Sequence, residues 1–360
     1  MNMTFRIVIL IVCLTNISFA QKQDYIWLSG IDQVPETNEV DGMSIDFNMS
    51  MPEYLPEIFK YGFGTYNGSI CDERGKLLFY TNGCAILNAD GSVMTNGDSL
   101  NYNEWFENWS GGDCDFGYIG HEDVLILPNL SKNSSYYIIG KVRIINGSSQ
   151  SRTFELHISE IVLDSINGNR VVTKNEKLYE GDDLSSSYLS AVPIKESEGF
   201  FIFQPKVEDS SLVSYKLDEN GFERLDDQNL EHFFDNFRSS ASGTSKFSPD
   251  GSRYAFYNFY DGLHVYDFDR ETGKISNHQY VEIFDSVNID DIRFSSVEWS
   301  PNSRFIYTSS RDELHQIDTW EENLQDGIRL IDVYNGTVDP FPTPFFLMSL
   351  APDCRIYIYI

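Results

Sequence analysis

The sequence predicts an all-β fold, a β-propeller of six or seven four-stranded antiparallel blades, and three observations support this. Strand-forming aromatic residues are abundant, with 21 Tyr and 26 Phe among 360 residues. Apolar and polar residues alternate within short runs such as Leu263 to Phe268, which is typical of strands and excludes helical repeats. A turn phrase also returns about every 50 to 65 residues. A long β-sandwich array is the remaining alternative.

The recurring phrase reads as strand, turn, strand. Proline fixes φ at the first central position of the turn, Asp or Asn caps the turn through its side chain, and Gly permits a left-handed residue. The three clearest copies are centred on Pro249-Asp250-Gly251, Pro301-Asn302-Ser303 and Pro352-Asp353-Cys354. Looser copies occur upstream, at Asp72 to Gly75, around Pro128 and around Pro193.

A second hairpin is expected after the first one in each complete repeat. These second hairpins are centred on turns within Leu87–Val93, Leu163–Val171, Lys216–Phe222, Asp267–Ile275 and Ile331–Val338. Two hairpins make four strands, and four antiparallel strands repeated at this period are typical of propeller blades, because each small sheet buries its faces only against the next.

Closure of the ring is the open point of this prediction. Five repeats are complete, a sixth begins at Leu347, and the sequence stops at Ile360 inside its second expected strand, so the last blade is expected to be C-terminally truncated. An open ring would expose strand edges. Strand-like pieces at Tyr25–Leu28 and Met43–Phe47 are expected to complete the last blade, unless residues beyond this sequence do so.

Residues 1–20 have the pattern of a secretory signal peptide, and residues 21–360 are expected to form the propeller domain. Arg6 precedes the apolar run Ile7 to Leu14, and Ser18-Phe19-Ala20 supplies a small-residue cleavage site. The alternative is a buried N-terminal strand. No later stretch approaches the roughly 18 apolar residues of a membrane helix. We therefore expect a secreted or extracellular protein, without membrane insertion.

The chain is strongly acidic, with 26 Lys and Arg against 55 Asp and Glu and a net charge of −29. A field of this sign repels phosphates, so nucleic acid is excluded as a partner. It is compatible with cations or basic partners, and equally with a purely solubilising surface.

Four cysteines follow the signal segment: Cys71, Cys84, Cys114 and Cys354. An even number in an exported protein allows disulfides. Cys71 is expected beside a hairpin turn whose far end lies near Cys84, which disfavours that pair, whereas Cys84 with Cys114 is geometrically freer. The pairing stays open, and none of the four has metal-ligand spacing.

Sequence motifs for catalysis are missing, so no catalytic residue is assigned. The chain has no G-x-S-x-G, no H-E-x-x-H, no C-x-x-C and no phosphate-binding glycine loop. His157, His264 and His315 alternate within apolar strands and are interpreted as packed or surface imidazoles. Asp267 to Gly273 superficially resembles a calcium loop, but its glycine is misplaced, and we interpret it as a hairpin turn.

The most unusual segment is Gly111–Asp123, in which glycines, acids and a histidine precede an inner strand. Its acids could converge on a divalent cation or a basic group, or they could form an acidic solvated loop. The preceding tryptophans could stack on sugars, anchor a partner, or cover a blade edge. The candidate ligand-binding residues are therefore Trp105, Trp109, Asp113, Asp115, His121 and Glu122.

Several phrases together resemble the N-terminal propellers, related to TolB-like and WD-type repeats, of large surface proteins of gliding, type IX-secreting bacteria. The phrases are Trp27 with Asp46-Phe47, Asp72 to Gly83, Met94 to Gly97, Tyr136-Tyr137, Ser248 to Gly251, Asp267 to Gly273, and Ala351-Pro352-Asp353 before Ile356-Tyr357. The resemblance implies a secreted scaffold, often followed by adhesion modules and a C-terminal sorting domain, without established catalysis. Cys354 departs from the pattern, which usually has Gly there, and no sorting domain is present in these 360 residues.

Three functions are therefore weighed. The first is an extracellular binding or scaffolding propeller that engages protein or glycan at the cell surface. The second is a metal-assisted hydrolase or lyase with its site in the propeller tunnel, which would need a divalent cation as cofactor. The third is a structural spacer of a larger surface protein. The repeat without a catalytic motif favours the first.

Overall fold

We describe a computed structural model of the chain. It describes residues 22–33, 39–63, 66–118, 124–145, 152–179, 181, 184–207, 209–231, 243–283, 295–336 and 344–358. No helix among them has the length and apolar character needed to cross a bilayer.

The described residues form antiparallel sheets, six of which have three to five strands and make the blades of a propeller. The first three blades are β1 (Ile26–Gln33), β2 (Val40–Asp46) and β3 (Glu53–Phe59); β4 (Gly68–Cys71), β5 (Leu77–Thr81) and β6 (Ile86–Asn88); and β7 (Val124–Pro128), β8 (Ser135–Ile145), β9 (Arg152–Val162) and β10 (Arg170–Tyr179).

The next three blades are more regular. They consist of β11 (Ser190–Pro193), β12 (Phe200–Pro205), β13 (Ser211–Asp218), β14 (Gly221–Arg224) and β15 (Gln228–Asn229); β16 (Thr244–Phe247), β17 (Arg253–Asn258), β18 (Gly262–Asp269) and β19 (Lys274–Val281); and β20 (Ser295–Trp299), β21 (Phe305–Ser310), β22 (Glu313–Asp318) and β23 (Ile328–Val333). A two-stranded sheet, β24 (Met348–Leu350) and β25 (Ile356–Ile358), follows, and the helices are α1 (Glu104–Ser110) and the 3-10 helix η1 (Leu324–Gly327).

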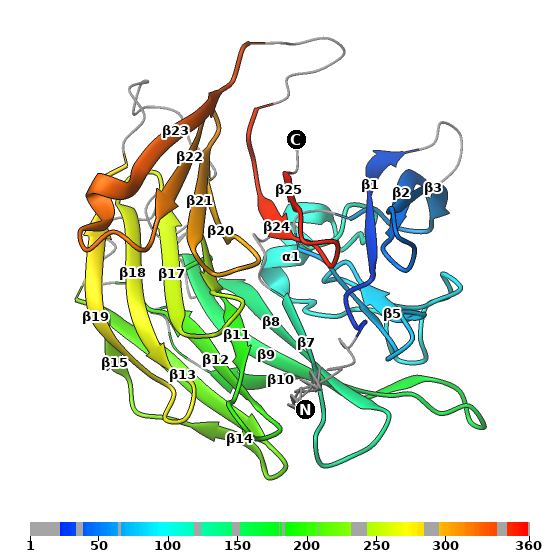
Figure 1. Cartoon of the computed structure of the whole chain (residues 1–360). Coiled ribbons are helices and arrows are strands. Elements are labelled where there is room, and N and C mark those ends of the chain that lie inside the picture. The colour runs from blue at the N-terminus through cyan, green and yellow to red at the C-terminus, as the bar shows by residue number, and fades with distance from the viewer. Residues whose placement is uncertain are drawn as a thin grey trace, which may run out of the picture.

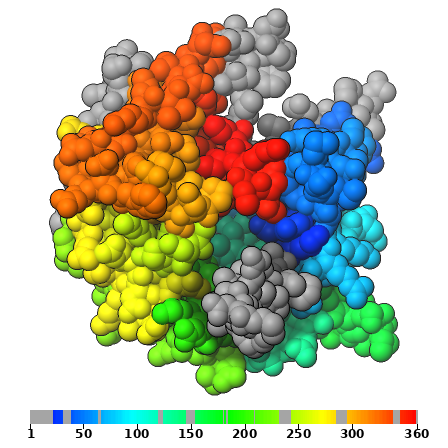
Figure 2. Space-filling model, viewed as in Figure 1, coloured from blue at the N-terminus to red at the C-terminus, as the bar shows by residue number. Residues whose placement is uncertain are grey.

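The sheets succeed one another around the molecule in chain order (Figure 1). In the space-filling view the C-terminal residues, coloured red, fill the space between β20–β23 and β1–β3 (Figure 2). The predicted all-β propeller is therefore confirmed, with six blades and the small sheet β24–β25 between the last blade and the first.

The ring closes differently from the prediction. The segments around Tyr25–Leu28 and Met43–Phe47 do not pair with β24 or β25 but form a sheet of their own with β3. The Tyr357 ring of β25 packs edge-on against Trp27 and Phe47, with ring centres 5.7 Å and 5.6 Å apart. Aromatic packing between sheet faces therefore joins the two ends of the described chain. The sequence did not reveal this blade because β1–β3 lacks the turn phrase.

Neighbouring blades are held together by apolar side chains that alternate along each strand. Phe203 of β12 meets Tyr254 and Phe268 of the next blade, with ring centres 5.5 Å and 5.4 Å away. Trp299 of β20 is fully buried in the following interface, and its indole N–H donates to the Lys246 carbonyl oxygen at 3.2 Å. Each blade thus buries one face against each neighbour, as the repeat predicts.

The turn phrase forms a turn with a left-handed residue in each of its three clearest copies. Ser248 Oγ donates to Asp250 Oδ1 at 2.7 Å and Ser300 Oγ donates to Asn302 Oδ1 at 2.7 Å. The residue after Asp or Asn is left-handed in all three copies, with φ of 68° at Gly251, 59° at Ser303 and 65° at Cys354. Cys354 therefore occupies, with some strain, the position where glycine is favoured.

One expected hairpin is wrong. The second hairpin of the β20–β23 blade does not turn within Ile331–Val338, because β22 ends at Asp318 and β23 already covers Ile328–Val333. The connection runs instead through η1, where the Asn323 side chain accepts from the Gln325 backbone N–H and Leu324 is buried. A capped apolar turn therefore replaces the Asn-Gly turn predicted from composition.

Candidate functional site

The helix α1 lies in the connection between β6 and β7 and is the only α-helix among the described residues. Asn103 caps its start by accepting from the Phe106 backbone N–H at 3.1 Å, and Gly111 ends it in a left-handed conformation with φ of 70°. Two good caps allow a helix of seven residues to form here. Trp105 and Trp109 lie four residues apart and therefore share one face of this helix.

This face forms what we call the aromatic platform, which consists of Trp105, Trp109 and Arg143. The two indole rings are stacked, with centres 5.9 Å apart and planes within 3° of parallel. The Arg143 guanidinium lies over Trp105, 4.7 Å from the ring centre, in cation–π geometry. Trp105 is half-buried, whereas Trp109 keeps 47% of its surface exposed. The platform therefore presents one indole, already oriented by its neighbours, to solvent.

The core beneath the platform fixes its position. Phe106 is fully buried and stacks on Tyr118, with ring centres 5.2 Å apart. The Tyr118 hydroxyl accepts from the Arg143 backbone N–H at 3.1 Å, and Asn103 Nδ2 donates to the Arg143 carbonyl oxygen at 3.0 Å. The helix and strand β8 are thus tied together at Arg143 itself.

A disulfide between Cys84 and Cys114 joins the loop after α1 to the end of the β5–β6 hairpin, with the Cα atoms 5.6 Å apart. This confirms the freer of the predicted pairings, while Cys71 is buried and free and Cys354 is exposed and free. Asn82 Nδ2 also donates to the Cys114 carbonyl oxygen at 3.1 Å. The loop that carries the acids is therefore covalently anchored.

Asp113 and Asp115 form a carboxylate pair next to this anchor. The Asp115 backbone N–H donates to Asp113 Oδ1 at 3.0 Å. Burial, together with the hydrogen bond and charge of Asp113, raises the pKa of Asp115 above its ordinary value. Two close acids of this kind offer acceptor oxygens to a ligand hydroxyl or a positive group.

Four of the six predicted site residues, Trp105, Trp109, Asp113 and Asp115, lie on α1 and on the disulfide-anchored loop that follows it. His121 and Glu122 lie outside the described residues, so their contribution stays a prediction. Within the described ranges, no group of three or more His, Cys, Asp or Glu side chains is placed to hold a metal ion. The proposed divalent cation stays a prediction as well.

Sequence reasoning missed Arg143, although it completes the platform. It lies on β8, far from α1 in the sequence, and no local pattern indicated that strand β8 would deliver a guanidinium onto Trp105. Arg143 lies in the part of β8 that pairs with β9, opposite Phe154, so its place over α1 depends on tertiary structure. An arginine at the end of a strand is otherwise unremarkable in sequence.

His157, His264 and His315 lie in strands, as predicted, with His264 buried and the other two partly buried. His264 is almost completely buried, and its Nδ1 lies 2.9 Å from His278 Nε2 with the two rings nearly parallel. His157 and His315 each lie against a carboxylate two residues earlier on the same strand. Asp267 to Gly273 connects β18 to β19 as a hairpin turn, which confirms that interpretation.

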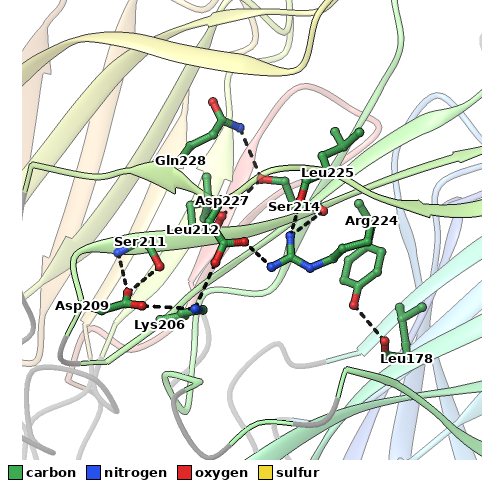
Figure 3. A network of polar contacts seen from close by, with 11 residues as sticks. Leu178, Lys206, Asp209, Ser211, Leu212, Ser214, Arg224, Leu225, Asp227 and Gln228 are labelled. Carbon is green, nitrogen blue, oxygen red and sulfur yellow. Dashed lines mark hydrogen bonds and ion pairs between the residues drawn. The ribbon is translucent and has the colours of Figure 1, made fainter.

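A second polar cluster lies on the β11–β15 blade, beside a cavity of about 470 Å³ (Figure 3). Lys206 Nζ bridges Asp209 and Asp227 at 3.1 Å and 3.0 Å, and Arg224 also pairs with Asp227. Burial raises the pKa of Asp227, but the hydrogen bonds from Lys206 and Arg224 outweigh burial and hold it below its ordinary value. Because these acids already have cationic partners, we interpret the cluster as ion pairs that stabilise this blade.

Comparisons with known proteins assign neither a family nor an activity to this chain. No family model matches the sequence, and no curated protein is similar to it. Among solved structures, a Lactobacillus plantarum protein is 11% identical with a TM-score of 0.46, covering 93% of this chain and 88% of its own. A putative 6-phosphogluconolactonase from Bacteroides uniformis is 11% identical with a TM-score of 0.44, covering 93% and 84%. The Dos1 propeller is 13% identical with a TM-score of 0.44, covering 94% and 92%. At these identities no activity carries over to this chain.

Proposed function

We propose that the protein is an extracellular binding propeller whose aromatic platform engages a glycan. The supporting observation is the geometry of Trp109, which is half exposed and stacked on Trp105, while Trp105 is itself covered by Arg143. A rigid aromatic surface of this kind lowers the entropic cost of binding, because little side-chain freedom is lost when the ligand arrives.

Glycans match the platform better than a general apolar ligand does. The apolar face of a sugar ring can lie flat on an exposed indole, and its hydroxyls can donate to carboxylates such as Asp113 and Asp115 in the loop that follows α1. The net charge of −29 disfavours anionic polysaccharides, so neutral or amino-sugar glycans are the expected class.

The extracellular location is part of the proposal. It is supported by the export pattern of residues 1–20, by the Cys84–Cys114 disulfide, which is characteristic of oxidising compartments, and by the resemblance to secreted bacterial surface propellers. Display at the cell surface, alongside sorting or adhesion modules, belongs to the same proposal.

A glycan array with wild-type protein and two tryptophan variants tests the proposal. Trp109→Ala should weaken binding to any captured glycan by about tenfold or more, as expected for an aromatic hot spot. Trp320→Ala is the matched control, because Trp320 is 73% exposed on another blade. It should leave binding unchanged.

Equal binding by wild type and Trp109→Ala would contradict the platform as the site. Failure of the wild type to bind any neutral or amino-sugar glycan would contradict the ligand class, and a protein partner would become the leading alternative.

A further inference from the structure

A second cavity lies away from the platform, between the β1–β3 blade and the β4–β6 blade. Its volume is about 540 Å³, which falls within the range of small-molecule sites. Strands β1 to β3 form one wall, and the β4–β5 and β6 turns form the other. This is the interface where the repeat pattern is weakest, since β1–β3 lacks the turn phrase.

The interior of this cavity is apolar and aromatic. Leu28 and Phe59 of one blade face Leu77 and Tyr80 of the other. Phe59 and Tyr80 belong to an aromatic group with Phe63, in which ring centres are 4.8 to 6.3 Å apart. Binding of a ligand with an apolar body would therefore displace water from this space with a favourable change in free energy.

Tyr80 supplies a free polar group inside the cavity. Only 3% of its surface is exposed, and its hydroxyl has no hydrogen-bond partner among the described residues. The hydroxyl lies 3.7 Å from the position that a Cβ on Gly91 would take, and Gly91 also lines the cavity. The hydroxyl oxygen itself is not fully buried, so it reaches the space of the cavity, where a ligand could accept or donate a hydrogen bond.

The charge around this hydroxyl is negative. Glu57 and Asp90 line the same cavity, and Glu57 Oε1 accepts from Ser44 Oγ at 3.0 Å while its second carboxylate oxygen has no partner among the described residues. Burial, followed by the charges of Asp90 and Glu57, raises the pKa of Tyr80 to about 12. Burial is the larger cause and penalises any charge, but the two carboxylates that add to it attract a cation.

The basic residues of the cavity lie at its mouth. Arg74 and Lys76 both belong to the exposed β4–β5 turn, where water screens their charges. Asp46 lines the wall on the same side and accepts from the Asn48 backbone N–H at 2.7 Å. Glu57 and Asp90 are exposed as well, so the cavity is lined by three acids, Asp46, Glu57 and Asp90, against these two bases.

We propose that this cavity binds a small organic ammonium ion with an apolar body. The ammonium group is placed at the Glu57 carboxylate and the Tyr80 hydroxyl, and the apolar body lies against Leu28, Phe59 and Leu77. The proposal goes beyond glycan recognition and does not depend on the platform.

Isothermal titration with three probes of the same shape tests the ligand class. Phenethylamine carries the ammonium, 2-phenylethanol is neutral, and phenylacetate is anionic. We expect phenethylamine to bind the wild type, 2-phenylethanol to bind about tenfold more weakly, and phenylacetate not to bind. No binding of phenethylamine, or equal binding of phenylacetate, would overturn the proposal.

Three variants test the residues. Glu57→Gln should weaken phenethylamine binding about tenfold and Tyr80→Phe about threefold. Glu53→Gln is the control, because Glu53 is an exposed acid on the same strand that does not line the cavity. Unfolding curves verify that each variant folds. Unchanged affinity in Glu57→Gln would overturn the assignment, whereas unchanged affinity in Trp109→Ala is expected and separates this site from the platform.

Discussion

The blades β16–β19 and β20–β23 differ from the β1–β3 blade in the number of their strands, which is four against three. In the two regular blades, Tyr257, Trp299 and Ile306 are fully buried at the shared interface. The outer strands are alike in exposure, because β3 exposes Tyr54, Leu55 and Ile58 and β23 exposes Leu330, Ile331 and Val333. The regular blades have the turn phrase and the β1–β3 blade does not. The repeat therefore builds the scaffold, and the proposed binding sites lie where the repeat is interrupted.

The largest expected effect is on a core tryptophan of the regular blades. Trp299→Ala should lower the free energy of unfolding by about 3 to 5 kcal/mol, because it leaves a cavity between two blades. Trp320→Ala should cost less than about 1 kcal/mol, since this exposed ring packs only over the Arg304 guanidinium at 4.0 Å. Denaturant titration measures the free energy of unfolding of both variants. A similar loss of stability in the two would contradict the assigned role of the blade interface.

The disulfide should give the next largest effect. Replacing Cys84 and Cys114 by serine should lower the free energy of unfolding by about 2 to 4 kcal/mol, because the unfolded chain regains the freedom of the loop. Cys354→Ser is the control, since Cys354 is exposed and free. Differential scanning calorimetry compares them, and a double variant as stable as the wild type would show that the platform loop is held by packing alone.

Two equivalent serines test whether the turn phrase repeats energetically as well as structurally. Ser248 Oγ accepts from the Arg253 backbone N–H at 3.0 Å, and Ser300 Oγ accepts from the Phe305 backbone N–H at 2.8 Å. Ser248→Ala and Ser300→Ala should each lower the free energy of unfolding by about 1 kcal/mol. Urea titrations measure these changes. A clear loss of unfolding free energy at one site and none at the other would show that the two turns are not equivalent.

The smallest expected effect concerns pH. Burial lowers the pKa of His278 from 6.5, although the charge of Glu231 partly opposes this. The folded state binds this proton less tightly than the unfolded state does. The contribution of neutral His278 to the free energy of unfolding is therefore complete above pH 6.5, and it is lost as the pH falls through the pKa of the folded state. Unfolding free energies measured between pH 7.5 and 5.5 should therefore fall less steeply in His278→Gln. An unchanged slope would contradict the burial of this imidazole.

Much of the fold could be predicted from the sequence because it is encoded locally. The Pro-Asp-Gly turn determines φ and hydrogen bonds within a few residues, so the hairpins at Pro249 and Pro301 were predictable without tertiary information. The β1–β3 blade was not, because its place depends on Trp27 meeting Tyr357 from the other end of the chain. Long-range aromatic contacts of this kind leave no local pattern.

The candidate site was predictable in part for the same reason. Trp105, Trp109, Asp113 and Asp115 lie in one short segment, so sequence could group them. The Arg143 guanidinium over Trp105 depends on strand order, and the cavity around Tyr80 depends on two blades meeting, so neither leaves a signal in the linear sequence.

The central claim, that ligand recognition lies where the repeat is interrupted, is tested most directly by hydrogen–deuterium exchange with and without a glycan selected on the array. The account predicts that the ligand slows exchange in residues 102–118 and around Arg143, while the turns at 248–253 and 300–305 are unaffected. Protection confined to those regular turns, with none in residues 102–118, would contradict it.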